Sequence, residues 1–286
     1  MNSFKPGFEI LNGKLQEAGS PVFSGDNRAF RYGDGLFETI CVRNGNPLFI
    51  QDHWNRLTRG LKILSIPMAE GLDIHKLKLA IDLLLQKHEL THARLRLIAY
   101  READGMYAPS NAKSSWLLSV TGKVEPLYQI NMPGLSADVF ESDFKTSGAL
   151  SNLKTLNALL FVCAGLEASE KGFDEMLIRN HKGHMIESVK ANLFIRQGTI
   201  FKTPPLSEGC LDGVMRKQVI QMLKQRNLEV LEVPLQLEDV MSSEELILTN
   251  VIQGAKWIEN FRGKKYGNQY ACLINGWLNE MLGHRS

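Results

Sequence analysis

Residues 28–66 read RAFRYGDGLFETICVRNGNPLFIQDHWNRLTRGLKILSI, and a change of pattern inside this stretch decides the fold class. Residues 36–42 (LFETICV) and 47–50 (PLFI) are rich in β-forming residues, and the Asn-Gly pair at 44–45 between them is a turn signal. From residue 51 the apolar side chains recur at helical spacing instead. A hairpin followed directly by an amphipathic helix predicts an α+β unit.

The sequence on either side extends this unit. Residues 8–24 contain a second Asn-Gly turn between two short strand patterns, and residues 71–90 form another amphipathic helical pattern. Residues 93–101 and 114–122 alternate as strands. We therefore expect a smaller α+β domain at residues 1–121.

The remaining residues, 122–286, predict a larger α+β domain. Strand patterns and helical patterns alternate there without regular βαβ spacing, which favours an α+β fold over a doubly wound sheet. Helices are expected after Ser151, from Asp212 and from Leu237. The expected strands are residues 128–132, 137–145, 173–180, 184–197, 200–205, 229–235 and 244–250.

Composition narrows the classes of partner. The 286 residues include 33 basic and 31 acidic side chains, whereas a nucleic-acid-binding protein usually has a basic excess. The four cysteines show no CxxC or metal-type spacing, which is typical of reduced thiols in a cytosolic protein. No apolar window is long enough to span a bilayer. We expect a soluble, cytoplasmic protein that binds a small molecule and no metal, nucleic acid or membrane.

Lys154 and Glu187 are the first two candidates for chemistry. Lys154 lies at the entrance of the apolar helical pattern after Ser151, where a lysine usually extends its amine into water. A desolvated lysine can instead form a Schiff base with a carbonyl group. Glu187 interrupts a strand pattern, either as an outward-facing residue or as a carboxylate directed at a cationic ring nitrogen.

Two further features could bind an anion. Asp212-Gly213 precedes a helical pattern, and the backbone N–H groups at a helix N-terminus favour phosphate. Arg56, with Arg59 and Lys62, lies on the polar side of its helix, where a solvated face is the simpler interpretation. Together, the four features supply an amine for an aldehyde, an acid for a pyridinium nitrogen, and two groups for a phosphate. Pyridoxal phosphate has those three functional groups.

At this point the sequence resembles a known family, the class IV aminotransferases, which are the fold-type IV pyridoxal-phosphate enzymes. This group includes branched-chain aminotransferases, D-amino-acid aminotransferases and 4-amino-4-deoxychorismate lyases. The resemblance covers most of the chain. Six motifs in order carry it: RAFRYGDGLFET, HWNRL, LKTLN, MIESVKANLF, LDGVMR and LTNVIQG.

The resemblance implies a role for each matching residue. Lys154 would be the catalytic Schiff-base lysine, Glu187 the acid at the pyridine nitrogen, and Arg56 the arginine that binds the cofactor phosphate. The other cofactor contacts would be Leu211, which packs against the ring, the helix N-terminus at Val214 and Met215, and the loop at Asn250 and Val251. The substrate pocket would contain Tyr32, Phe37, Thr39 and Arg101.

The resemblance also implies two α+β domains with the cofactor between them, and a homodimer. The residues of these motifs are most similar to those of the lyases, which would release pyruvate from aminodeoxychorismate and leave 4-aminobenzoate. Two departures concern substrate anion binding: Met106 stands where lyases tend to have a second arginine, and Lys256 where an apolar residue is expected. Transamination of a branched-chain or D-amino acid with 2-oxoglutarate is the alternative, and a non-catalytic binding protein on the same scaffold is a third reading.

Overall fold

The computed structural model describes residues 7–283, and these divide by their contacts into two compact units. The first unit runs to Pro126 and also includes Leu153–Asn157; the second contains the other residues. This division falls a few residues beyond the boundary expected at residue 121. It also groups Lys154 with the first unit, whereas the sequence analysis placed that residue in the larger domain.

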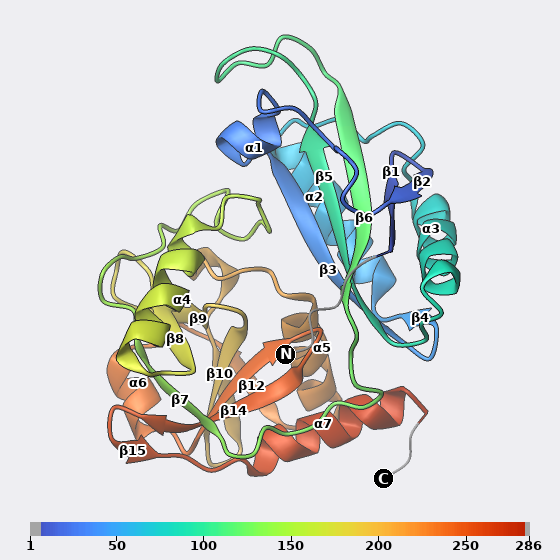
Figure 1. Cartoon of the computed structure of the whole chain (residues 1–286). Coiled ribbons are helices and arrows are strands. Elements are labelled where there is room, and N and C mark those ends of the chain that lie inside the picture. The colour runs from blue at the N-terminus through green and yellow to red at the C-terminus, as the bar shows by residue number, and fades with distance from the viewer. Residues whose placement is uncertain (1–6, 284–286) are drawn as a thin grey trace. The chain divides into compact units, whose positions relative to one another are not determined.

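The first unit is built on a six-stranded antiparallel sheet with the strand order β2-β1-β6-β5-β3-β4 (Figure 1). Its strands confirm both expected hairpins and both strands that follow the second helical pattern. The returning strand of the second hairpin is shorter than expected, because it is Asn46–Pro47 and not residues 47–50, and α2 begins at Ile50. The strands are β1 (Phe8–Leu11), β2 (Lys14–Glu17), β3 (Gly35–Arg43), β4 (Asn46–Pro47), β5 (Ala93–Arg101) and β6 (Ser114–Gly122), and the helices are α1 (Arg28–Tyr32), α2 (Ile50–Ile63) and α3 (Ile74–Lys87).

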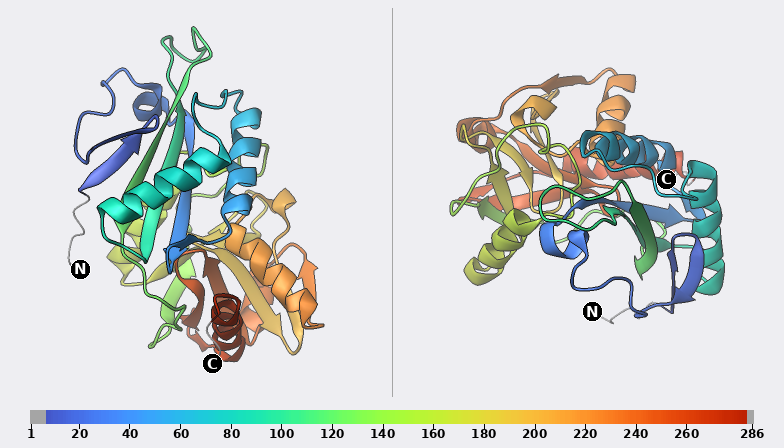
Figure 2. Two further views of the ribbon diagram at one scale, coloured as in Figure 1. Left: turned by 90° about the vertical axis from the view of Figure 1, so that its right-hand side faces the viewer. Right: turned by 90° about the horizontal axis from the view of Figure 1, so that it is seen from above.

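Helices α2 and α3 lie against the same face of this sheet (Figure 2, left). Because successive side chains of a strand point to opposite faces, β3 divides its residues between two environments. Leu36, Ile40 and Val42 join the apolar core beneath the helices, whereas Phe37 and Thr39 lie on the opposite face, half-buried. Two of the predicted pocket residues therefore share the face that α2 and α3 leave uncovered.

The second unit contains a nine-stranded sheet in which β10 pairs with both β13 and β9. The pairing of β10 with β9 closes strands β10, β13, β14, β7, β8 and β9 into a ring. A single residue pair, Asn192 with Glu187, makes this closure. The strands are β7 (Leu135–Val139), β8 (Glu175–Arg179), β9 (Met185–Ser188), β10 (Asn192–Gln197), β11 (Ile200–Thr203), β12 (Glu229–Glu232), β13 (Glu245–Asn250), β14 (Gly254–Phe261) and β15 (Lys264–Lys265).

Four α-helices of the second unit pack against different strands of this sheet. Helix α4 contacts β8, α6 contacts β10, α5 contacts β12 and β13, and α7 contacts β13 and β14. No helix among residues 7–283 has the length and apolar character needed to cross a membrane. The helices are α4 (Leu159–Lys171), α5 (Val214–Gln225), α6 (Leu237–Ser242) and α7 (Gln269–Met281), with a short 3-10 turn η1 (Leu206–Glu208) before α5.

Several expectations for the second unit were wrong. Residues 128–132 form no strand, because the side chain of Asn279 in α7 bonds both backbone groups of Tyr128 and takes the place of a neighbouring strand. The expected strand at 184–197 is two strands, separated by a turn in which Ser188 N–H donates to the carbonyl of Ala191. The expected strand at 137–145 ends at Val139. No element was predicted for residues 254–281, where β14, β15 and α7 lie.

Candidate functional site

Glu187 lies in β9 with only 3% of its surface exposed, so the outward-facing interpretation of this residue is wrong. Both carboxylate oxygens are engaged. The amine of Lys145 donates to Oε1 at 2.6 Å, and the backbone N–H of Leu211 donates to Oε2 at 2.9 Å. Each carboxylate oxygen has a second lone pair, so the group retains the capacity to accept a further donor such as a protonated ring nitrogen.

The backbone of Leu211 is fixed at both of its polar groups. Its N–H is bound by Glu187, and its carbonyl accepts from the side-chain amide of Asn192 at 2.9 Å. Since Glu187 and Asn192 are the pair that closes the strand ring, the loop that carries Leu211 is attached directly to this closure. The structure thus brings together two of the predicted cofactor contacts, Glu187 and Leu211.

Gly213 ends this loop as the N-cap of α5, and its lack of a side chain is required. A Cβ atom at this position would lie 1.8 Å from Oδ1 of Asn192. As a glycine N-cap, Gly213 also offers no side-chain acceptor to the first-turn N–H groups of the helix. Val214 and Met215 begin α5, with 5% and 1% of their surfaces exposed. Backbone N–H groups at the start of a helix are the kind of donor that binds anions.

Asn250 is the last residue of β13, next to Thr249, the register partner of Asn192, and Val251 follows it. The carbonyl oxygen of the Asn250 side chain accepts from the N–H groups of Ile252 and Gln253, at 3.1 and 2.9 Å. These bonds give the loop a defined conformation without a regular element.

Cys210, which precedes Leu211, does not supply a nucleophile to this site. Its side chain is buried, and burial raises the pKa of the thiol to about 12. A thiol with so high a pKa stays protonated near neutral pH. Among the described residues, no group of His, Cys, Asp or Glu side chains is arranged to bind a metal ion.

In the first unit, Lys154 lies on an extended segment and not at the mouth of a helix, because α4 begins only at Leu159. The segment pairs with the start of β3: Phe37 N–H donates to the carbonyl of Lys154 at 2.9 Å, and Leu156 N–H donates to the carbonyl of Gly35 at 3.0 Å. Backbone pairing to a buried strand holds this lysine more firmly than a fraying helix end would.

The ring of Phe37 lies beneath two cations. The amine nitrogen of Lys154 is 4.4 Å from the ring centroid, and the guanidinium carbon of Arg96 is 3.9 Å from it. Arg96 is half-buried in β5, directly opposite Thr39 in the strand register. Its pKa is lowered by burial and by the charge of Arg94. Lys154, Phe37, Thr39 and Arg96 therefore form a compact cluster that is rich in positive charge.

Arg56 is buried, which overturns the interpretation of this residue as part of a solvated face. Its Nε donates to Oε1 of Glu38 at 2.8 Å and its Nη2 to Oε2 at 2.5 Å, while Nδ1 of His53 contacts the same Oε2 at 2.7 Å. Burial alone would raise the pKa of Glu38. The charge of Arg56 and the hydrogen bonds from Arg56 and His53 outweigh this effect and lower the pKa to about 2. The ion pair fixes the plane of the Arg56 guanidinium.

Arg101 and Tyr32 also have defined partners. Three nitrogens of Arg101 donate to Asp34, to the carbonyl of Ser65 and to the carbonyl of Leu64, at 3.0, 2.9 and 2.6 Å. Three of the five N–H groups of the guanidinium are therefore used within the first unit. The ring of Tyr32 packs on that of Tyr107 at 5.7 Å between centroids.

The two departures from the lyase pattern have different surroundings. Met106 is 73% exposed in the loop between β5 and β6. Lys256 lies in β14, where its amine donates to the carbonyl of Gln129 at 3.0 Å and burial lowers its pKa. Neither side chain lies in one of the clusters described above.

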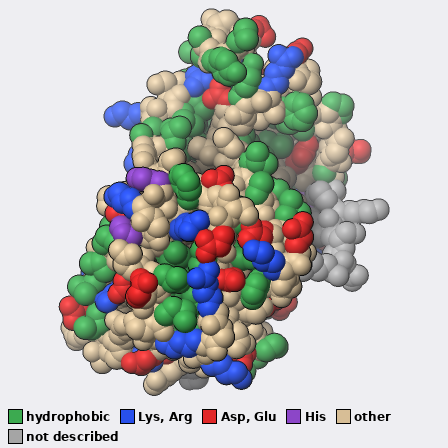
Figure 3. All heavy atoms as spheres, turned by 90° about the vertical axis from the view of Figure 1, so that its left-hand side faces the viewer, with side chains coloured by type: hydrophobic (Ala, Val, Ile, Leu, Met, Phe, Trp, Pro, Cys, Tyr) green, Lys and Arg blue, Asp and Glu red, His purple; other side chains and the backbone are tan. Residues whose placement is uncertain are grey.

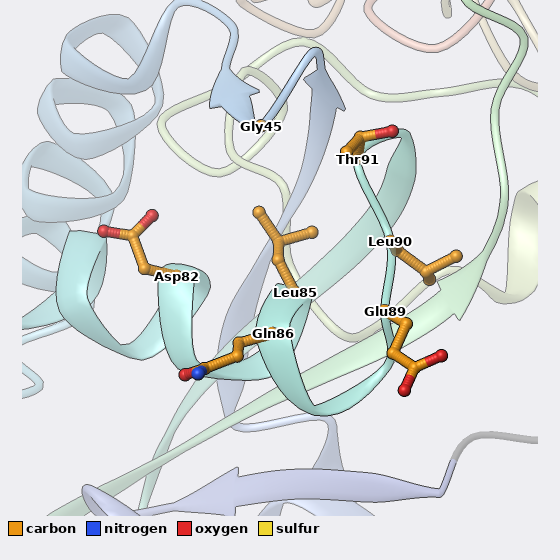
Figure 4. Close-up of a pocket in the computed structure, with 7 residues that line it drawn as sticks. All are labelled: Gly45, Asp82, Leu85, Gln86, Glu89, Leu90 and Thr91. Carbon is orange, nitrogen blue, oxygen red and sulfur yellow. The ribbon is translucent and has the colours of Figure 1, made fainter.

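A cavity of 340 Å³ in the first unit lies apart from these residues. It is found beside the C-terminal end of α3 and the turn after β3, and it contains no predicted site residue (Figure 4). On the face of the molecule shown in Figure 3, basic and acidic side chains are interspersed, in agreement with the near balance of 33 basic and 31 acidic residues. The cavity is lined by Gly45, Asp82, Leu85, Gln86, Glu89, Leu90 and Thr91.

Four residues of these clusters were not identified from the sequence: Glu38, Arg96, Lys145 and Asn192. Arg96 could have been found, because strand alternation in ARLRLIAYR places Arg94 and Arg96 on the face opposite Leu95 and Leu97. Lys145 carries no comparable signal, because it lies in an irregular segment between β7 and α4.

The residues present fit the functional groups of pyridoxal phosphate. The first unit contains a lysine amine, the group that reacts with an aldehyde, and the second unit contains a buried carboxylate with remaining acceptor capacity for a ring nitrogen. The glycine-capped start of α5 and an arginine held in one plane are suited to a phosphate.

Comparisons with known proteins agree with this fit to pyridoxal phosphate. The model of the family "Amino-transferase class IV" matches residues 35–259. A Methanocaldococcus jannaschii protein named as a branched-chain-amino-acid aminotransferase is 29% identical, over 94% of this chain and 93% of the relative. The aminodeoxychorismate lyase of Bacillus subtilis is 26% identical, over 91% and 88%. The crystal structure of the Escherichia coli branched-chain amino acid aminotransferase superposes with a TM-score of 0.88 at 21% identity, covering 99% of this chain and 97% of that one.

Proposed function

Because the chain belongs to the class IV aminotransferases, a family of pyridoxal-phosphate-dependent enzymes, we propose that it acts on a small amino substrate that carries a carboxylate. The reaction we favour is the lyase reaction of 4-amino-4-deoxychorismate, which yields pyruvate and 4-aminobenzoate. The single observation that carries the substrate class is the placement of Arg96 and Lys154 on one aromatic ring. It puts a guanidinium suited to a carboxylate near the amine that would carry the chemistry.

Each predicted residue has a proposed task. Lys154 holds the cofactor through its aldehyde, and Glu187 keeps the ring nitrogen protonated. The N–H groups of Val214 and Met215, the Asn250–Val251 loop and Arg56 bind the phosphate, and Leu211 packs against the ring. Phe37, Thr39 and Tyr32 line the substrate pocket, and Arg96 joins them as the carboxylate contact in place of Arg101, whose nitrogens are used within the unit.

When bound, the cofactor supplies an electron sink for a carbanion at the substrate carbon next to the amine. The protein residues move and hold the protons. The amine of Lys154 would take the proton from that carbon. Glu187 retains the proton at the ring nitrogen, which is the condition for the sink to work. Arg96 fixes the substrate carboxylate, so that the reacting carbon stays within reach of Lys154.

The alternative is an aminotransferase reaction with 2-oxoglutarate, with a branched-chain or D-amino acid as the donor. Lys154 would then return the proton to the cofactor carbon instead of assisting the elimination. The residues of the motifs and the similarity to the lyase of Bacillus subtilis support the lyase reaction. The similarity to the Methanocaldococcus jannaschii relative supports the aminotransferase reaction. A homodimer and a cytoplasmic location are part of the same proposal.

Two assays distinguish the reactions. Purified protein loaded with pyridoxal phosphate is incubated with aminodeoxychorismate, and pyruvate is measured by coupling to lactate dehydrogenase. In parallel, L- and D-amino acids are tested with 2-oxoglutarate for ketoacid products. Formation of pyruvate from aminodeoxychorismate, and its loss in the Lys154→Ala variant, would support the lyase. Ketoacids from the amino acids, with no pyruvate from aminodeoxychorismate, would support the aminotransferase instead. No change in the visible absorbance of pyridoxal phosphate on addition of the protein would favour the non-catalytic reading.

A further inference from the structure

Lys145 and Glu187 form an ion pair in which both members are shielded from water. The distance from the amine nitrogen to Oε1 is 2.6 Å, and the side chains are 14% and 4% exposed. Lys145 is held in place from its own side as well. Its N–H donates to the carbonyl of Arg179 at 3.0 Å, and its amine lies 5.4 Å from the centroid of the Phe161 ring.

The remaining interactions of Glu187 show what Lys145 contributes. Among the described residues, the carboxylate also accepts a hydrogen bond from the N–H of Leu211, which is a neutral donor. Lys145 therefore supplies the positive charge that balances Glu187 within the described part of the second unit. Removal of this cation would leave a buried carboxylate without a compensating charge, which is unfavourable.

From this arrangement we propose that Lys145 is a positioning residue that competes with the ring nitrogen of the cofactor for the charge of Glu187. The inference rests on the proposed function, because it takes Glu187 as the acid at that nitrogen. Lys145 holds the carboxylate of Glu187 in place beside Leu211 before the cofactor arrives. Its own charge then weakens the attraction of the site for a protonated ring.

This competition has a definite sign. Without Lys145, the ring nitrogen becomes the main partner of Glu187, so the contribution of the nitrogen to binding increases. A cofactor analogue with carbon in place of the ring nitrogen cannot share a proton with Glu187. The preference of the protein for pyridoxal phosphate over 1-deazapyridoxal phosphate therefore measures the strength of this contact.

The experiment measures dissociation constants of both compounds for the full-length protein, by quenching of tryptophan fluorescence. In Lys145→Met we expect the preference for pyridoxal phosphate to rise about tenfold above wild type, which corresponds to about 1.4 kcal/mol. Lys145→Arg restores the cation and should return the preference to the wild-type value. In the Glu187→Gln background, Lys145→Met should have no further effect on the preference.

Lys171→Met is the matched control, because Lys171 also contacts a glutamate, Glu167, at 2.6 Å in the same unit, but is 49% exposed. It should leave the preference unchanged. If Lys145→Met does not fold, Lys145→Gln, which removes the charge and keeps a donor, gives the same comparison.

The outcomes separate this inference from the function on which it rests. If Glu187→Gln abolishes the preference seen in the wild type, but the neutral Lys145 variants leave that preference unchanged, the role of Lys145 alone would be overturned. No preference in the wild type would instead remove Glu187 from the ring nitrogen, and with it the proposed site.

Discussion

Arg96 and Lys154 lie over the same ring, that of Phe37, at 3.9 and 4.4 Å from its centroid. The two cations come from elements far apart in the sequence, β5 and the segment before α4. They meet because that segment pairs with the start of β3, which carries Phe37. The strand register then determines which side chain of β5 lies beside the lysine.

Substitution of Arg96 by leucine tests this arrangement. We expect kcat/KM for the carboxylate-bearing substrate to fall about 10- to 100-fold, since hydrogen bonds to charged groups contribute about 1.5–3 kcal/mol. Arg94→Leu is the control, because Arg94 lies two residues earlier on β5 and is exposed. Steady-state kinetics that show equal effects of the two substitutions would contradict the role of Arg96.

Glu38 predicts a pH dependence of stability. Its pKa is about 2 in the folded protein and 4.5 in its ordinary state. A lowered pKa contributes stability above the ordinary value, and this contribution is lost as the pH falls from about 4.5 toward 2. The free energy of unfolding in urea should therefore decline by about 3 kcal/mol over this range because of Glu38 alone. The Glu38→Gln variant should have a lower free energy of unfolding at the upper end of this pH range and a flatter decline as the pH falls. An unchanged slope would contradict this role of Glu38.

Gly213→Ala tests the close approach at the start of α5. The added Cβ would overlap Oδ1 of Asn192 at 1.8 Å, so the variant should lose about 1–3 kcal/mol of stability and bind pyridoxal phosphate more weakly. Gly276→Ala provides the control. Gly276 lies in helix α7 with open space around it, and alanine there should stabilise the protein by up to about 1 kcal/mol. Thermal unfolding of both variants would show opposite shifts.

Arg101→Met separates a structural role from a role in substrate binding. Because the guanidinium bonds Asp34 and two carbonyls after α2, we expect a loss of about 3 kcal/mol in the free energy of unfolding. KM measured well below the unfolding temperature should change little. A large rise in KM with unchanged stability would return Arg101 to the substrate pocket.

The α+β class and most elements of the first unit could be predicted from the sequence, because its hairpins and amphipathic helices carry strong local signals. The wrong expectations have different physical causes. In the expected strand 128–132, both backbone groups of Tyr128 are bonded by the side chain of Asn279, a partner that is distant in the sequence and leaves no local pattern. The expected strand 184–197 is divided by a local turn between Ser188 and Ala191.

In the candidate site, several residues could be predicted from the sequence, but their partners could not. Motif order identified Lys154, Glu187 and Arg56 as candidates, whereas their partners depend on three-dimensional contacts. Arg56 has the same helical spacing as the polar residues of α2, yet the carboxylate of Glu38 makes its burial possible. Lys145 is brought to Glu187 by a bridge between residues 145 and 180, which no spacing rule would indicate.

The most direct test of the central claim is reduction of the cofactor-loaded protein with borohydride, followed by peptide mass mapping. The account predicts that the pyridoxyl group is found on Lys154 and that Lys154→Ala abolishes the labelling. Labelling of a different lysine in the wild type, or undiminished labelling of Lys154→Ala, would contradict it.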